Sequence, residues 1–136
     1  MRLQPFAIAS VLSLALTGLS TGAAFAQARS ATAKSGQETK LGEHMRVGKD
    51  CGPPAVAGQE FTVVKQPANG SITTRQATAE LKNATGPNEK CKGKSFPAVQ
   101  VYYKSKDGWK GSDSFSYKFG PAASKPQEQT VNVTVN

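Results

Sequence analysis

Residues 108–119 read GWKGSDSFSYKF, a glycine-rich turn that runs into a segment with an aromatic residue at every second position. Successive side chains of a β-strand point to opposite faces, so Phe115, Tyr117 and Phe119 share one face. Three aromatic rings on one face require a second layer that covers them. The stretch therefore predicts the core strand of a small all-β domain.

Other short segments with strand composition stand at intervals of roughly ten residues. Alternating, β-branched or weaker patterns mark residues 41–47, 61–64, 72–74, 77–81, 99–103 and 129–135. Between two of them, Asn69 and Gly70 predict a hairpin turn, because both residues accept a positive φ. Six or seven short strands with no helix beyond the N-terminal region predict an immunoglobulin-like sandwich of about seven strands.

The first 26 residues have the pattern of a cleaved signal peptide. Arg2 gives a positive start, residues 6–19 are largely apolar, and residues 24–26 read AFA. We expect cleavage after Ala26, with Ala28 as the alternative. Because the apolar run is shorter than the ~20 residues of a spanning helix, no membrane span is predicted. The protein is predicted to be exported, either to a periplasm or out of the cell.

The rest of the chain has the length of one domain. Residues 27–40 are small and polar, and they predict a flexible leader. Residues 41–136 predict the sandwich itself.

Cys51 and Cys91 are the two cysteines of the chain. In an exported protein such a pair predicts one disulfide. Closing a loop of about 40 residues would stabilise the fold by roughly 4 kcal/mol. Cys51 lies in the turn-rich residues 48–54, and Cys91 lies in a long polar loop predicted for residues 83–97. The bridge would therefore tether two loops.

Four motifs occur in order: PANGSI at 67–72, VYY at 101–103, GWKGSDSFSY at 108–117 and TVNVTV at 130–135. With them the chain resembles the bacterial immunoglobulin-like or cadherin-like repeat domains of secreted and surface proteins. The resemblance implies a sandwich in a small, single-domain exported protein. The cysteine pair lies outside the shared pattern.

The side chains that commonly carry catalysis or bind metals are sparse. His44 is the only histidine, and no glycine-flanked serine suggests a nucleophile. We expect His44 to be solvated or at a strand edge. A copper site formed by His44 and Met45 would lack a third ligand nearby. We predict no catalytic residue, no metal and no cofactor.

Trp109, Asp113, Phe115 and Tyr117 form the predicted structural corner. Asp113 is expected to accept hydrogen bonds from the backbone amides of its own turn. A calcium site is the alternative, although Asp107 is the one acidic neighbour. Trp109 is expected to pack at the corner, with stacking against a sugar or peptide as the alternative.

The formal net charge of the chain is +8, and lysines are concentrated in its C-terminal half. The predicted site for an anionic surface comprises Lys90, Lys92, Lys94, Lys104, Lys106 and Lys110. A basic patch concentrates anionic partners by screened attraction, whereas edge lysines also serve only to keep a sandwich soluble. Compartment and the absence of a recognition motif disfavour nucleic acid.

We therefore predict a non-enzymatic binding or cell-envelope interaction module that favours anionic envelope polymers. The alternative is a periplasmic structural or accessory protein that docks on a protein partner by a sheet edge. The residues do not indicate an oligomeric state.

Overall fold

The computed structural model describes residues 28–53, 61–120 and 125–136. These residues form seven strands and two short 3-10 helices. The strands are β1 (Ala28–Ala33), β2 (Glu38–Met45), β3 (Phe61–Lys65), β4 (Gly70–Glu80), β5 (Ser95–Ser105), β6 (Gly111–Phe119) and β7 (Glu128–Val135), and the helices are η1 (Lys49–Cys51) and η2 (Gly86–Cys91). The predicted signal peptide lies outside the described residues.

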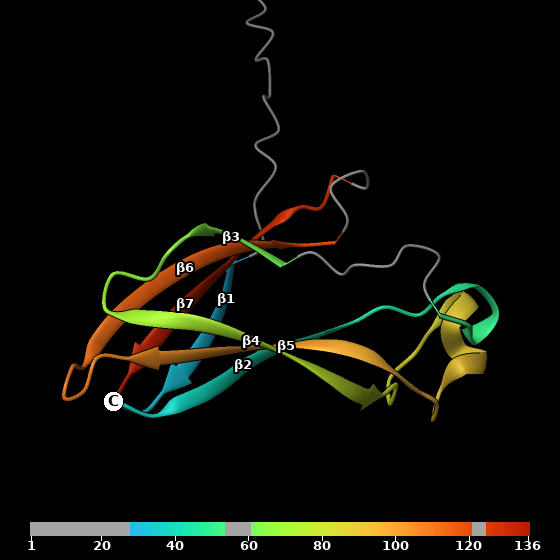
Figure 1. Ribbon diagram of the computed structural model, residues 1–136, viewed down its shortest axis with the longest axis horizontal. Coiled ribbons are helices and arrows are strands. Elements are labelled where there is room, and N and C mark those ends of the chain that lie inside the picture. The colour runs from blue at the N-terminus through green and yellow to red at the C-terminus, as the bar shows by residue number, and fades with distance from the viewer. Residues whose placement is uncertain (1–27, 54–60, 121–124) are drawn as a thin grey trace, which may run out of the picture.

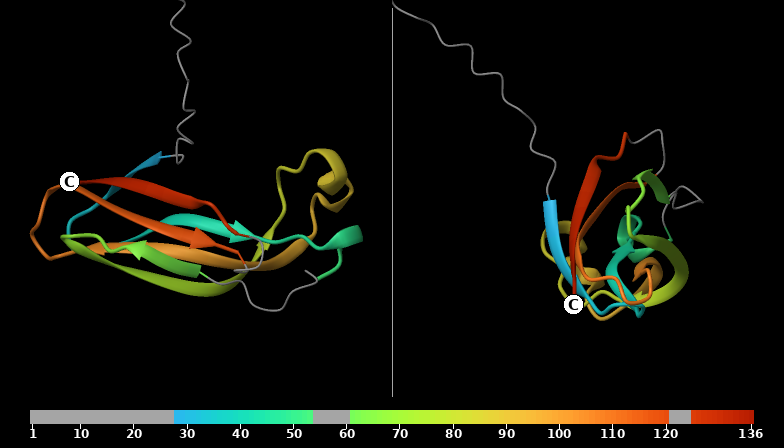
Figure 2. Two further views of the ribbon diagram at one scale, coloured as in Figure 1. Left: turned by 90° about the horizontal axis from the view of Figure 1, so that it is seen from above. Right: turned by 90° about the vertical axis from the view of Figure 1, so that its left-hand side faces the viewer.

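The strands form two sheets that stack as layers (Figures 1 and 2). One sheet has the order β1-β7-β6-β3, and the other has the order β2-β5-β4. The β1–β7 pair is parallel, and every other pair in the described chain is antiparallel. The prediction of an all-β sandwich of about seven strands is confirmed.

The main core lies between the two sheets and follows the alternation of the sequence. Its buried members are Ala33, Val101, Tyr103, Phe115, Tyr117, Val131, Val133 and Val135. Phe115 and Tyr117 are fully buried on β6, and Phe119 packs against the same cluster. β5, β6 and β7 thus place alternate apolar side chains in the core, as period-two patterning requires.

The predicted flexible leader is wrong for most of residues 27–40. Residues 28–33 form β1, which pairs with β7 from Ala28 opposite Thr130 to Ala33 opposite Val135. Residues 38–40 begin β2, so the strand expected at 41–47 starts earlier. The small polar residues of β1 carry little strand signal. Its pairing with β7 and the burial of Ala33 supply the stability that its composition lacks.

The predicted hairpin at Asn69 and Gly70 is also wrong. The chain crosses there from one sheet to the other, because β3 pairs with β6 whereas β4 pairs with β5. Neither residue has a positive φ. Gly70 is needed for space instead, since a Cβ there would lie 2.5 Å from Cε2 of Tyr103.

The connection between β4 and β5 is shorter and more ordered than predicted. The strand expected at residues 77–81 is the end of the eleven-residue β4. Within the loop expected at 83–97, residues 86–91 form η2 and residues 95–97 already belong to β5. Beyond the main core, Phe96, Ala98 and Cys91 are buried towards this end of β5.

Candidate functional site

A disulfide joins the two short helices at one end of the sandwich. The Sγ atoms of Cys51 and Cys91 lie 2.04 Å apart, and their Cα atoms lie 5.4 Å apart. Cys51 ends η1 and Cys91 ends η2, so the bridge connects the segment after β2 with the segment before β5. The predicted disulfide is confirmed.

Backbone hydrogen bonds hold the second of these segments against Leu81, the residue that follows β4. The Leu81 amide donates to the Lys94 carbonyl (2.9 Å), and the Gly93 amide donates to the Leu81 carbonyl (2.9 Å). The Lys94 amide donates to the Cys91 carbonyl (3.1 Å). The main chain of residues 91–94 is therefore fixed on both sides, which also fixes where their side chains leave the backbone.

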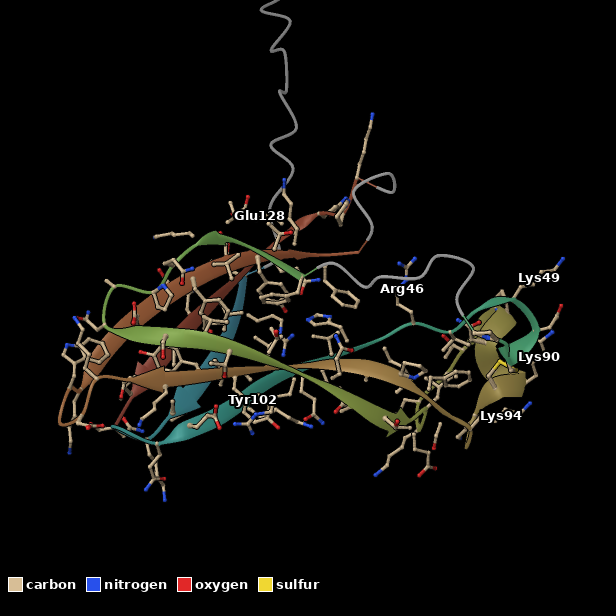
Figure 3. All side chains as sticks on the ribbon, viewed as in Figure 1. Arg46, Lys49, Lys90, Lys94, Tyr102 and Glu128 are labelled. Carbon is tan, nitrogen blue, oxygen red and sulfur yellow. A yellow bond between two sulfur atoms is a disulfide. The ribbon has the colours of Figure 1, made fainter. Side chains whose placement is uncertain are left out.

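Lysines surround this disulfide (Figure 3). Lys90 forms an ion pair with Asp50 of η1, at 2.5 Å between Nζ and Oδ1. Lys49, Lys92 and Lys94 are exposed and make no ion pair with a carboxylate of the described chain. We call Lys49, Lys90, Lys92 and Lys94 the disulfide-end lysines.

Lys49 was not among the lysines predicted from the sequence. It lies about 40 residues from Lys90 along the chain, and the disulfide brings their segments together. The available signal was its position two residues before Cys51. When a disulfide joins two loops, the charged residues next to one cysteine come close to those next to the other.

The six predicted lysines do not form one patch. Lys94 precedes the first residue of β5, and Lys104 lies near its last residue. Ten residues of extended strand separate them by roughly 33 Å, several times the screening length at physiological ionic strength. Lys104, Lys106 and Lys110 are exposed at the opposite end, and we call them the far-end lysines.

Asp113 organises the crossing between the sheets. Its carboxylate is buried and accepts hydrogen bonds from the amides of Ala68 (2.9 Å), Asn69 (3.0 Å) and Ser114 (2.9 Å) and from the Tyr103 hydroxyl (2.9 Å). We had expected donors from its own turn, but three of the four come from other elements and only the Ser114 amide is local. With four donors in place, the carboxylate links β6 to the crossing segment and to β5.

The pKa of Asp113 reflects two opposed effects. Burial raises it, but the hydrogen bonds from Asn69, Ser114, Tyr103 and Ala68 outweigh burial and hold it below its usual value. On the other side of the same contact, burial raises the pKa of Tyr103, and the Asp113 carboxylate raises it further.

Trp109 packs at the turn before β6. It is partly buried, and it belongs to the apolar side chains that pack against the main core. Its ring lies over Gly111, where an added Cβ would meet Cζ2 at 3.2 Å. The predicted corner residues Trp109, Asp113, Phe115 and Tyr117 are thus all placed in the packing of one turn and strand.

Of the two placements expected for His44, the structure shows the strand edge and not a solvated ring. His44 lies on the edge strand β2, but its ring is half-buried between the sheets. Nε2 lies 2.6 Å from the Tyr117 hydroxyl oxygen, and the Tyr117 hydroxyl donates to Oε1 of Gln129 (3.1 Å). The ring stacks on Phe119 at 4.6 Å between centroids.

Arg29 of β1 lies close to this histidine. Its guanidinium donates to the Leu41 carbonyl at 3.1 Å, next to the irregular register of β2. Burial lowers the pKa of His44, and the positive charge of Arg29 lowers it further. Burial raises the pKa of Tyr117. The cluster thus favours neutral forms of both rings.

A shallow depression of about 500 Å³ lies on the sheet that contains β6 and β7. Its lining consists of Ser30, Ala68, Asn69, Ser112, Asp113, Ser114, Asn132, Val133 and Thr134. Small hydroxyl and amide side chains dominate the lining, and its one carboxylate, that of Asp113, already accepts four hydrogen bonds. The depression therefore offers short polar groups and no free charge of its own.

The described residues contain neither a membrane-spanning helix nor a cluster of metal ligands. None of the helices there is long and apolar enough to cross a membrane. No group of three or more His, Cys, Asp or Glu side chains is placed to hold a metal ion in that part of the chain.

Fold and cross-link together define the class of this protein: an all-β sandwich with one disulfide between two end loops. Comparison of the chain with protein-family models, with curated proteins and with solved structures finds no match.

Proposed function

We propose that this protein is an exported, non-enzymatic, immunoglobulin-like module that binds anionic polymers of a cell envelope through its disulfide-end lysines. The observation that carries the proposal is that the main chain beneath these lysines is fixed by cross-links, which we call the clamp. A disulfide and three main-chain hydrogen bonds fix the segments that bear exposed lysines, so the positive charges occupy a defined end of the molecule.

The sheet orders support the immunoglobulin-like part of the proposal. β2-β5-β4 corresponds to strands B-E-D, and β7-β6-β3 corresponds to strands G-F-C of such domains. In this correspondence the disulfide joins the B–C connection to the D–E connection. Variable immunoglobulin domains use the end that carries the B–C loop for recognition. The disulfide-end lysines lie at the equivalent end.

The type of charge fits a polymer with many anionic groups. Lysine is a compact, hydrated point charge on a flexible stem, whereas arginine suits bidentate recognition of one anion. Exposed lysines attract phosphate- or carboxylate-rich surfaces over about 8 Å at physiological ionic strength. Such binding weakens steeply as salt rises.

Two further observations support export and the absence of catalysis. A disulfide is typical of proteins that fold in an oxidising compartment. His44, the single histidine, is engaged by the Tyr117 hydroxyl and by the Phe119 ring. These contacts favour a packing role over that of a general base.

Salt-gradient elution from immobilised heparin and from lipopolysaccharide tests the proposal. We expect the wild-type domain to be retained at low salt and released by about 0.5 M salt. Replacing Lys49, Lys92 and Lys94 by glutamine should weaken binding about tenfold or more, given up to about 1 kcal/mol per lysine near an anionic surface.

The matched control replaces Lys104, Lys106 and Lys110 by glutamine, which removes the same charge from the far end. It should elute close to the wild type. Equal losses in the two triple variants would show that net charge alone causes retention and would overturn the assigned site. Melting temperatures of both variants establish that the fold is retained.

A further inference from the structure

Four strands lie at sheet edges: β1 and β3 in one sheet, and β2 and β4 in the other. Each presents backbone groups that a further strand can pair with unless something prevents it. Natural sandwiches blunt such edges with short strands, bulges or charges. The four edges of this protein differ in how well they are blunted.

Three of the edges carry one of these devices. β3 has five residues, and its register shifts between Val63 and Lys65. β2 shifts register between Lys40 and Gly42. β1 has six residues and is parallel to its neighbour. A shift or a short length interrupts the row of free backbone groups on each of them.

β4 carries neither device. Its eleven residues pair with β5 in one unbroken register, from Gly70 opposite Ser105 to Glu80 opposite Ser95. Of the strands that the structure describes, β5 alone pairs with it. Residues 71–79 include four β-branched side chains and a single charge, Arg75, which pairs with Glu38. The strand is long, regular and rich in residues that favour β-structure.

The face of β4 that points to the main core is partly open. Ile72, Thr74 and Gln76 lie opposite the buried Tyr103, Val101 and Val99 of β5. Thr74 and Gln76 are nevertheless exposed. An added strand would therefore meet both backbone groups and side chains along β4.

We propose that the free edge of β4 binds an extended segment of another protein as an additional strand, and that this segment carries acidic residues at both ends. Such strand addition takes its affinity from main-chain hydrogen bonds and its specificity from alternate side chains. The proposal concerns the edge of β4, which shares only Lys94 with the disulfide-end site, and it does not depend on anionic polymer binding.

The charges at the two ends of β4 indicate which kind of segment can bind along its edge. Lys104 lies opposite Ser71 at the start of β4, and the Lys106 ammonium lies 3.4 Å from the Ala68 carbonyl nearby. Lys82 and Lys94 lie at the other end, where the Leu81 amide donates to the Lys94 carbonyl. They outnumber the exposed Glu80 that ends β4, so this end also has a positive balance of charge. A second copy of β4, parallel or antiparallel, would bring two positive ends together. A segment with acidic ends meets a lysine pair at each end.

A synthetic peptide, Glu-Glu-Thr-Val-Thr-Val-Thr-Val-Thr-Glu-Glu, serves as the probe. Fluorescence anisotropy gives its affinity, and amide hydrogen exchange locates it on the protein. We expect saturable binding and at least tenfold slower exchange of alternate amides of β4, with β1, β2 and β3 unchanged. Protection of another edge, or none, would overturn the proposal.

Two N-methylated versions of the peptide keep its charge and side chains. Each version methylates alternate amides, so only one of them blocks the amides that face β4. We expect that version to lose at least tenfold in affinity while the other still binds. Equal affinity of the parent and both versions would show attraction by charge alone and would overturn strand addition.

Charge reversal tests the chosen occupant. The variant with Lys82→Glu and Lys104→Glu should weaken binding of the Glu-ended peptide about tenfold and improve binding of a Lys-ended version. Protection of β4 that grows with protein concentration in the absence of peptide would identify a second copy as the occupant and contradict the charge argument. Retention on heparin is scored separately, so the two proposals fail independently.

Discussion

At the residue scale, Asp113 gives the most direct prediction. Replacing it with Asn keeps the shape but removes the charge and one acceptor atom, which leaves donors from Ala68, Asn69 or Tyr103 without a partner. We expect the free energy of unfolding to fall by about 2 to 4 kcal/mol. Urea denaturation of the two proteins measures the difference, and a loss below about 0.5 kcal/mol would contradict the assigned role.

The same carboxylate predicts an acid-sensitive component of stability. Its pKa in the folded protein lies below the usual value of 3.8. The unfolded chain therefore takes up the proton first, and the contribution present above about pH 4 is lost as the pH falls towards the folded pKa. In the Asp113→Asn variant this part of the acid dependence should be absent. Denaturation midpoints between about pH 5 and 2 report it.

His44 predicts a dependence in a different pH range. Its folded pKa lies below 6.5, so the unfolded chain binds the proton more readily once the pH drops below that value. Stability should therefore decline as the pH falls from about 7 through 6.5 towards the folded pKa, and it should be constant above that range. Because the chain has one histidine, His44→Gln should flatten the curve. Calorimetric melting temperatures at several pH values test this, and an unchanged slope in the variant would refute it.

At the element scale, the crossing from β3 to β4 depends on the absence of a side chain at Gly70. An alanine Cβ would lie 2.5 Å from the Tyr103 ring and 2.7 Å from the Lys104 carbonyl oxygen. We expect Gly70→Ala to destabilise the fold by about 2 to 3 kcal/mol. Gly42→Ala is the matched control, since its Cβ would lie 3.7 Å from its nearest neighbour, Nη1 of Arg29. Similar losses for both variants would argue against a steric cause.

The elements also show which parts of the fold sequence alone can predict. Alternation identified β5, β6 and β7, because buried apolar side chains recur at every second position in each of them. It did not identify β1, whose Ala, Ser and Thr side chains are ordered by pairing with β7. The Asn-Gly pair indicated a turn but not which sheet the next strand would join. The crossing is held by hydrogen bonds to Asp113, whose partners Ala68 and Asn69 lie 45 and 44 residues away.

At the scale of the whole molecule, a similar limit applied to the candidate site. The number of cysteines predicted the bridge, and the number of lysines indicated that one half of the chain is basic. Neither number gives the positions of these residues in the folded protein. β5 separates Lys94 from Lys104 by its full length, whereas the disulfide brings Lys49 close to Lys90. Local composition thus identified the charges, and long-range pairing decided which of them share a surface.

Removing the disulfide tests how stability and binding are connected across the molecule. The loop that it closes spans 40 residues, so the variant with Cys51→Ser and Cys91→Ser should lose about 4 kcal/mol of stability. The melting temperature should fall by roughly 15 to 30 °C. The main core contains neither cysteine, and near-ultraviolet circular dichroism below the transition should still report packed aromatic rings.

Polymer binding by this variant shows whether the spatial arrangement of the disulfide-end lysines matters in addition to their charge. The substitution changes no lysine, but it releases η1 from η2, so Lys49 is no longer held beside Lys90. We expect elution from heparin at lower salt than the wild type, because freely moving lysines must be ordered again on binding. Wild-type protein treated with a reductant should behave in the same way. If the variant is folded and elutes at the wild-type salt concentration, the lysines act by charge alone, and the clamp serves stability only.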